Sequence, residues 1–431
     1  MTTHGDRPVL RELRLTEFKT FRGGVLPLAP VTLLAGGCGA GRSNALEALA
    51  LLSALAEGED IEEIGEAAAA PDRWPPFLPQ QQGGEGRGAG AVAARRSGLR
   101  GGPAAWAPHG TSRLALGCTV ATAAGRLLLD VEIAVDPPVR VVRERLVLGG
   151  EVLMETAEEA PEHHRINARW AGGGRQRSIR APLSSARLVT AQLPLRVAGA
   201  TEAEHRVLSG AEQMLTALRE VFPIDPVPEL MRRPVPLPPQ GSADARLRGD
   251  GRNLSLVLHR MRRECPHRWA RLTRSLAALT PASAPTLVLD VDTDEHGARA
   301  VLDEGRYGRI GADRMSGGML RHLALAAVLL TGPDVLDMPS TREVPWAHRS
   351  LVVLADDVDA GLGPEQAGAL LGLALDHADK GHLRMLAAVQ DPRCAAGLDP
   401  RLVSVVACRR DLDSGASVLT VPEEDAVDLP V

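Results

Sequence analysis

Lysine is nearly absent from this sequence of 431 residues. Lysine and arginine together number 49, of which only Lys19 and Lys380 are lysines, so 47 are arginines. The 54 acidic residues give a formal net charge of -5, which excludes a protein whose whole surface is built to coat nucleic acid. Since glycine, alanine and proline are also abundant, we interpret the arginine excess as a sign of GC-rich coding rather than of function.

Cysteine is also scarce, and no run of 18 apolar residues occurs anywhere in the chain. The cysteines are far apart, without the paired spacing of a zinc site or of a disulfide framework. We expect a cytoplasmic protein with no membrane partner, because the first residues also lack the apolar segment of a signal peptide. The five cysteines are Cys38, Cys118, Cys265, Cys394 and Cys408.

The hydrophobic pattern predicts an α/β fold. Residues 10–18 alternate apolar and polar side chains, as in a half-buried strand, and residues 31–35 are a continuous apolar run typical of a central strand. A glycine-rich loop and an Ala/Leu-rich helix follow directly. Residues 112–156 repeat strand patterns and predict an antiparallel meander, whereas the last 130 residues return to alternating strands and helices.

These patterns divide the chain into an N-terminal lobe over residues 1–156, a mainly helical insertion over 157–285, and a C-terminal lobe over 286–410. Residues 71–110, rich in glycine and proline, are predicted to be a disordered insertion. Residues 411–431 carry six acids and no base, which predicts a solvated tail.

The loop after residues 31–35 has the glycine framework of a phosphate-binding loop. It matches G-x-x-x-x-G-K-[ST] from Gly36 onward, with arginine at the lysine position. Backbone N–H groups of such a loop and the following helix N-terminus bind polyphosphate, and the serine hydroxyl can reach magnesium. The alternative is an ordinary glycine turn. The residues expected to bind nucleotide are Gly36, Gly39, Gly41, Arg42, Ser43 and Asn44.

A second candidate is the segment Ser316, Gly317 and Gly318, which opens an apolar helix. Taken alone, it is a common helix N-cap. Its N–H groups are also suited to the γ-phosphate of a nucleotide presented by another subunit.

Two acidic residues end an apolar strand, and a glutamine ends the next one. Asp356 is the expected magnesium ligand, together with Ser43, and Asp357 is placed to orient an attacking water. Gln390 is placed to sense the γ-phosphate. Two adjacent acids at a strand end also occur in simple turns.

In this order, the motifs resemble the ATPase heads of the SMC/RecF/OLD-like branch of the ABC superfamily, small AAA-family ATP-binding proteins. The resemblance rests on LRELRLTEFKTFRGGVLPLAPVTLLAGGCGAGRSNALEAL, GDGRNLSLVLHRM, RMSGGMLRHLALAAVLL, VVLADDVDAGLGP and AAVQDP. It implies a two-lobed P-loop NTPase that binds ATP and Mg2+ as a head-to-tail homodimer. It also implies that residues 36–43 form the Walker A loop, Ser316 opens the signature, and Gln192 serves as a Q-loop residue.

Three positions depart from that family, which usually has lysine at 42, glutamate at 357 and histidine at 390. Arg42 replaces a compact ammonium with a wide planar fork. Asp357 is one methylene shorter, and Gln390 cannot become a cation. We therefore expect slow or impaired hydrolysis, with a pseudo-ATPase scaffold that no longer binds nucleotide productively as the alternative; the motor of an ABC transporter is a weaker third one.

Further partners are less well specified by the sequence. The resemblance suggests an effector protein in trans or DNA, and residues 165–180 carry five arginines and no acid, as in a hairpin that contacts phosphates. The same segment also fits a solvated loop in an arginine-rich chain. His163 and His164 lack neighbouring ligands for a metal and are expected to be exposed.

Overall fold

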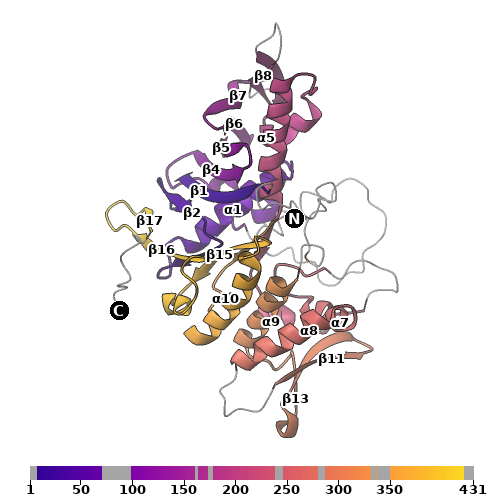
Figure 1. Ribbon diagram of the computed structural model, residues 1–431. Helices are drawn as coiled ribbons and strands as arrows, with labels where there is room; N and C mark the ends of the chain where they lie inside the picture. The colour runs from indigo at the N-terminus through magenta and orange to yellow at the C-terminus, as the bar shows by residue number, and fades with distance from the viewer. Residues whose placement is uncertain are drawn as a thin grey trace.

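The computed structural model describes residues 7–69, 99–160, 164–172, 178–237, 246–279, 287–331, 336 and 350–421. Its strands form three sheets with helices packed between and around them (Figure 1). The first is antiparallel and has eight strands in the order β2-β1-β4-β5-β6-β7-β8-β9. Its strands are β1 (Val9–Glu17), β2 (Val25–Pro27), β4 (Arg113–Thr122), β5 (Gly125–Ala134), β6 (Arg140–Leu148), β7 (Glu151–Ala160), β8 (Arg165–Ala171) and β9 (Ser178–Ser184).

The second sheet is central and has the order β10-β14-β15-β3-β16-β17. Its first five strands are parallel, and β17 is antiparallel to β16. The strands are β3 (Val31–Ala35), β10 (Val221–Ile224), β14 (Leu351–Ala355), β15 (Leu383–Val389), β16 (Val403–Arg410) and β17 (Ser417–Thr420). A third, antiparallel sheet consists of β11 (Val288–Asp294), β12 (Gly297–Asp303) and β13 (Arg309–Gly311).

Helices cover both faces of the central sheet. Between it and the meander lie α1 (Arg42–Ala56) and α5 (Glu202–Arg219); its other face carries α10 (Pro364–Ala378) and α9 (Gly317–Leu330). Beyond α9 follow α8 (Pro266–Ser275) and α7 (Leu254–Glu264), which reaches the third sheet. Shorter helices are α2 (Ile61–Ala69), α4 (Val189–Gln192) and α6 (Pro228–Met231).

Side chains of the central strands alternate between two hydrophobic cores. On β3, Leu34 packs with α1 and the meander, whereas Leu33 packs with α9 and α10. On β15, Leu386 and Met385 divide in the same way. A strand covered on both faces needs apolar residues at every position, which explains the continuous run in VTLLA. The two cores define the two lobes and confirm the α/β class predicted from the sequence.

The structure differs from the predicted domain organisation at the start of the helical insertion. The border at residue 156 falls inside β7, and residues 165–184, assigned to a mainly helical insertion, form β8 and β9 at the edge of the meander. The pattern of Arg165–Ala171 explains the difference: Ile166, Ala168 and Trp170 are buried, and the residues between them are not. Helices of the same range do not form one unit either, because α5 packs on the meander, whereas α7 and α8 pack with α9 and the third sheet.

Part of the predicted disordered insertion is ordered. Residues 70–98 lie outside the described residues, but Leu99 and Trp106 are buried, and a short 3-10 helix spans Pro103–Ala105. Similarly, the predicted tail begins with β17, which pairs with β16, and residues 422–431 lie outside the described part. The amino-acid composition did not predict the order of these two segments, because a few buried contacts hold each of them in place.

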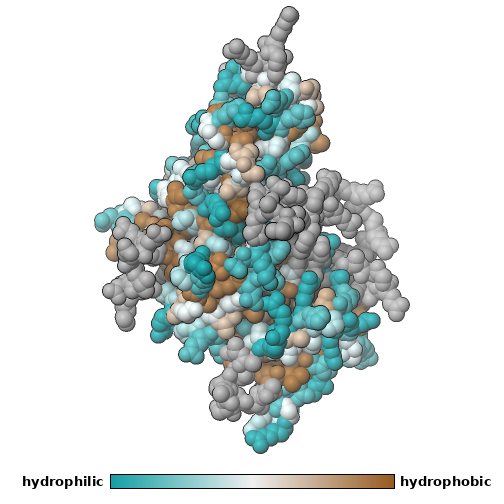
Figure 2. Space-filling view, viewed as in Figure 1, coloured by the Kyte–Doolittle hydropathy of each residue, from teal (hydrophilic) through white to brown (hydrophobic). Residues whose placement is uncertain are grey.

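Hydrophilic residues cover much of the face shown in Figure 2. Among the helices that the structure describes, none is both long and apolar enough to cross a membrane.

A buried carboxylate on a strand of the meander predicts that the stability of the protein depends on pH. Glu144 on β6 is fully buried and accepts hydrogen bonds from the backbone N–H groups of Val189 and Thr190, both at 2.6 Å. Burial raises the pKa of Glu144 to about 7 from 4.5. The folded state therefore binds this proton more tightly than the unfolded chain, so the stability present below pH 4.5 is lost as the pH rises to about 7.

We expect Glu144→Gln, which stays neutral, to remove this dependence. The free energy of unfolding of the variant relative to wild type should rise by on the order of 3 kcal/mol between pH 5 and pH 8, measured by urea denaturation. The matched control is Glu132→Gln on β5, whose carboxylate is paired with Arg113 near the surface. An equal pH slope for wild type and Glu144→Gln would contradict the prediction.

Candidate nucleotide-binding site

The glycine loop connects β3 to α1 at the carboxyl edge of the central sheet. Gly36 has no room for a side chain, because a Cβ atom there would lie 2.1 Å from the carbonyl oxygen of Cys408. Gly41, which directly precedes α1, has a φ of 107°, and a Cβ atom there would lie 2.2 Å from Ser417 Oγ. Two of the predicted glycines are thus required by the local backbone, whatever the loop binds.

The hairpin of β16 and β17 holds the loop from one side. Ser417 Oγ donates to the carbonyl oxygen of Ala40 at 2.6 Å, and the Cys408 thiol lies 3.2 Å from the same oxygen. Burial raises the pKa of Cys408 to about 11, which keeps the thiol protonated. Asn44 Nδ2 donates to Thr20 Oγ1 at 2.8 Å, and Thr20 in turn bonds Ser417. The loop is therefore preorganised by side chains that lie far away in the sequence.

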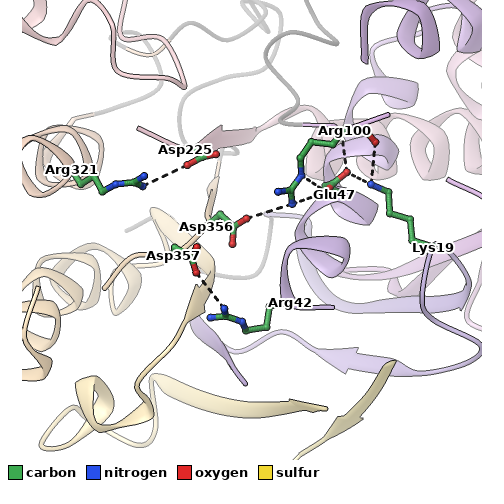
Figure 3. A network of polar contacts seen from close by, with 8 residues as sticks. All are labelled: Lys19, Arg42, Glu47, Arg100, Asp225, Arg321, Asp356 and Asp357. Carbon is green, nitrogen blue, oxygen red and sulfur yellow. Dashed lines mark hydrogen bonds and ion pairs between the residues drawn. The ribbon is translucent and has the colours of Figure 1, made fainter. Parts of the chain in front are cut away.

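The Arg42 side chain is nearly buried and contacts the ends of two neighbouring strands. Its Nη1 donates to the carbonyl oxygen of Val389 at 2.5 Å, and its Nη2 lies 3.4 Å from Asp357 Oδ1. The side chain is only 10% exposed. The guanidinium thus joins α1 to the ends of β15 and β14 (Figure 3).

Asp356 and Asp357 follow β14 directly, as the sequence indicates. Asp357 has a φ of 45°, a left-handed conformation that Asp and Asn adopt more readily than longer residues. Asp356 Oδ2 lies 3.6 Å from Arg100 Nη2. The Oδ1 atoms of both residues are buried, with no hydrogen bond to any residue that the structure describes.

This donor set fits magnesium held together with a phosphate. The Ser43 hydroxyl and the Asp356 carboxylate are hard oxygen ligands, and Asp356 Oδ1 is a buried acceptor with no hydrogen-bond donor among the described residues. Within the described ranges, no group of three or more His, Cys, Asp or Glu side chains could hold a metal. Magnesium commonly uses one or two carboxylates, waters and substrate phosphates, so such a protein cage is not needed.

Glu47, a buried acid on α1, pairs with two cations next to the site. Glu47 is 4% exposed; it pairs with Lys19, and Oε1 and Oε2 accept from Arg100 Nε at 2.9 Å and Arg100 N at 3.0 Å. Burial lowers the pKa of Lys19, while Glu47 opposes that shift. Sequence reasoning missed this cluster, although one acid within the apolar helix ALEALALL is a signal for a buried pair.

Asp225 is another residue that sequence reasoning missed. It follows β10, the strand beside β14, and lies 3.7 Å from Arg321 on α9. Burial raises the pKa of Asp225, and the nearby Asp356 carboxylate raises it further. Figure 3 shows Asp225, Asp356 and Asp357 between Arg321 on one side and Arg100 on the other. The parallel pairing of β10 with β14 brings these acids together.

The predicted Q-loop residue has a different setting. Gln192 lies on α4, where its Oε1 accepts from Ser184 N at 3.0 Å and its Nε2 donates to Ser184 O at 2.9 Å. Both ends of the amide therefore hold the turn after β9. Nothing in this arrangement places Gln192 at the carboxyl edge of the central sheet.

Gln390 follows β15, at the same edge as the loop. Its backbone N–H donates to both oxygens of Asp359, at 3.0 and 2.9 Å, and Asp391 N donates to Asp359 Oδ2 at 2.8 Å. Asp359 is 8% exposed and fixes this turn from the segment after β14. The side chain of Gln390 is exposed and lines a pocket beside the glycine loop.

That pocket has a volume of about 460 Å³. The loop residues that line it are Gly36, Gly37, Cys38 and Ala40. Gln390 and Pro392 form one side and the end of β16 the other, because β3 lies between β15 and β16 in the sheet. The carboxyl ends of parallel strands are the usual ligand-binding edge of α/β sheets.

The serine-glycine segment opens α9. Ser316 caps this helix by accepting from Met319 N at 3.1 Å, and Gly318 lies against Gly361, whose carbonyl oxygen would be 2.3 Å from a Cβ atom at 318. Gly361 belongs to the segment after Asp357, so the start of α9 lies next to that segment. The residues that line the pocket do not include Ser316. Residues 36–44, Asp356, Asp357 and Gln390 follow β3, β14 and β15 at one edge of the central sheet.

The arginine-rich segment 165–180 forms the β8–β9 hairpin, with residues 173–177 outside the described part. Arg169 pairs with Glu155 on the neighbouring strand, which reduces the positive charge there. His164 is exposed, as expected, and His163 lies outside the described residues.

No family model matches this sequence, and no curated protein matches it. Among solved structures, the chain is similar to an SmcHead bound to the C-winged helix domain of ScpA, with 12% identity over 97% of this chain and 98% of that chain and a TM-score of 0.46. It is also similar to the Smc head domain with an extended coiled coil bound to the C-terminal domain of ScpA derived from Pyrococcus furiosus (11% identity, 96% of each chain, TM-score 0.44). A third is the SMC head domain from Thermotoga maritima (11% identity, 96% of this chain and 99% of that chain, TM-score 0.40).

The Glu47 cluster predicts a large loss of stability when its charge is removed. Glu47→Gln leaves Lys19 and Arg100 without their shared anion, and Lys19 is largely buried. We expect the free energy of unfolding to fall by on the order of 3 kcal/mol, measured by chemical denaturation at pH 7. The control, Glu12→Gln, removes an exposed pair with Arg126 and should cost less than about 1 kcal/mol. Equal losses of stability in the two variants would contradict the prediction that the Glu47 cluster contributes more than an exposed ion pair.

Proposed function

We propose that the chain is an ATP- and magnesium-binding head that acts as a head-to-tail homodimer with slow hydrolysis. The observation that carries this proposal is the strand, glycine loop and helix arrangement at Gly36–Ser43, with Asp356 and Asp357 at the same edge of the sheet. Backbone N–H groups of the loop and the N-terminus of α1 bind the phosphates. Magnesium, held by Ser43 and Asp356, neutralises phosphate charge when bound.

The start of α9 supports the proposed dimer. A helix start with Ser316, Gly317 and Gly318 offers N–H groups suited to a phosphate, and Ser316 is not among the residues that line the pocket beside the glycine loop. A second copy, in the opposite orientation, would bring its Ser316 to the loop of the first. Opening and closing of this dimer then acts on an effector protein or on DNA, in a repair or defence process of the cytoplasm.

The contacts of Asp357 support the proposal of slow hydrolysis. Its carboxylate lies 3.4 Å from the Arg42 guanidinium, so it is already engaged by a cation in place of a water. Gln390, at the γ-phosphate position in this proposal, can donate a hydrogen bond but cannot carry a positive charge. The site therefore favours binding and release of nucleotide over rapid turnover.

One observation favours a second candidate, a scaffold that no longer binds nucleotide productively. Arg42, the cation of the loop, is engaged by Val389 and Asp357 and is nearly buried. Calorimetry on the wild-type chain separates the two functions. ATP binding that requires magnesium supports the switch, whereas no binding and an unchanged melting temperature at millimolar ATP support the scaffold.

The dimer is tested with Ser316→Asp. Aspartate is a good N-cap and keeps the bond to Met319 N, but it adds a negative charge where the triphosphate of the other subunit would lie. We expect wild type to dimerise with ATP and magnesium in analytical ultracentrifugation. The variant should bind ATP with similar affinity and stay monomeric. Ser178→Asp, at the exposed start of β9, is the control and should dimerise. Dimerisation of Ser316→Asp would contradict the head-to-tail arrangement.

The restraint on Asp357 is tested with Arg42→Lys. A lysine side chain lacks the planar fork that reaches Val389 and Asp357 together, so the carboxylate becomes available to a water. We expect the rate of phosphate release at saturating ATP to rise roughly tenfold, a change of about 1.4 kcal/mol in the barrier. Arg42→Lys/Asp357→Asn serves as the control and should lose the gain. An unchanged rate in Arg42→Lys would show that the pair does not limit turnover.

A further inference from the structure

The end of β16 carries two adjacent arginines beside the glycine loop. Arg409 and Arg410 close the strand, and both line the pocket of about 460 Å³ together with Gly36, Gly37 and Cys38. Both side chains are exposed. No motif in the sequence singles them out among 47 arginines.

Strand geometry distinguishes the two arginines. Side chains alternate along a strand, so Val405, Ala407 and Arg409 share one face of β16, and Cys408 and Arg410 share the other. Residues of both faces line the pocket, and on the second face the Cys408 thiol reaches the carbonyl oxygen of Ala40. Arg409 shares its face with two further lining residues, Val405 and Ala407, whereas Arg410 shares its face with one, Cys408.

Arg409 differs in its charge environment from Arg42 and Arg100. Arg42 lies 3.4 Å from Asp357, and Arg100 lies 2.8 Å from Glu47 and 3.6 Å from Asp356. Among the residues that the structure describes, Arg409 has no ion pair and no side-chain hydrogen bond. A guanidinium free of acidic partners, at a pocket bounded by loop backbone, is suited to a phosphate group.

We propose that Arg409, rather than Arg42, is the side chain that binds the polyphosphate of the nucleotide at this loop. The inference rests on the proposed function, because it assigns the cation of that same site. β3 lies between β15 and β16, so Gln390 and Arg409 flank the start of the loop from its two sides. A polyphosphate on the loop would contact backbone N–H groups below and the guanidinium from the side.

The test compares phosphate-dependent affinity in charge-matched variants. Full-length wild type, Arg409→Ala and Arg409→Lys are titrated with ATP, ADP, AMP and inorganic tripolyphosphate in magnesium by calorimetry. Arg263→Ala, at an exposed position on α7 in the other lobe, removes the same charge and is the control. Circular dichroism and melting temperature confirm that each variant is folded.

We expect Arg409→Ala to weaken ATP and tripolyphosphate binding roughly 10- to 100-fold, the range for a lost charge-assisted hydrogen bond. Arg409→Lys should lose less, AMP should change least among the nucleotides, and Arg263→Ala should match wild type. Wild-type ATP affinity in Arg409→Ala would overturn the inference and leave the proposed function standing. If Arg42→Ala loses ATP binding while Arg409→Ala keeps it, the inference is overturned and the proposed function still stands.

A wild-type chain that binds no nucleotide would refute the proposed function. In that case tripolyphosphate binding that is lost in Arg409→Ala would still support an anion site at Arg409. Absence of tripolyphosphate binding as well would overturn the inference together with the function.

Discussion

The arrangement of the site depends on the contacts that the Arg42 guanidinium makes with Val389 and Asp357. This side chain starts on α1, donates to the end of β15 through the carbonyl oxygen of Val389, and lies beside Asp357 at the end of β14. Three elements that are separate in the sequence are thereby joined at one edge of the sheet. Because the side chain is nearly buried, a charge here needs its partners, and removal of either one leaves an unpaired group in a region of low dielectric.

The residue types at positions 42 and 357 fit each other. A guanidinium can donate to a carbonyl oxygen and approach a carboxylate at the same time, which a single ammonium does with less fixed geometry. Asp357 has a φ of 45°, which suits a short acidic side chain. The aspartate and the arginine are thus consistent with one local structure, and neither needs to be explained as a defect of a phosphate loop.

The sequence predicted those parts of the structure that depend on local patterns. The apolar run at residues 31–35 was predicted to be a central strand, the glycine loop was predicted to follow it, and the acids at 356 and 357 were predicted to end another strand, because the order of strand, loop and helix is local. The predicted disordered insertion and the predicted tail were wrong where composition and structure diverge, as at Trp106 and at β17. Such segments are fixed by a few long-range contacts that composition does not record.

The charged residues around the loop required the structure. Glu47, Asp225 and Asp359 have no motif, and their roles follow from burial and from partners more than 30 residues away or on neighbouring strands. Lys19 belongs to the same class, because nothing in its local sequence shows that it faces the acid on α1. Side-chain direction, which period and spacing do not give for isolated residues, decides all of these contacts.

The pairing of cations with acids also determines which of them is available to a ligand. A phosphate that recruited Arg42 would have to compete with the carbonyl oxygen of Val389 and with Asp357, and one that recruited Arg100 would have to compete with Glu47. Each competition leaves a buried or partly buried acceptor without its donor, at a cost on the order of 1–3 kcal/mol per group. Arg409 is exposed and unpaired among the described residues, so binding through it requires only the partial desolvation of one side chain. In the proposed site, the ion pairs that stabilise the edge of the sheet therefore favour Arg409 over Arg42 and Arg100 as the contact of an anionic ligand.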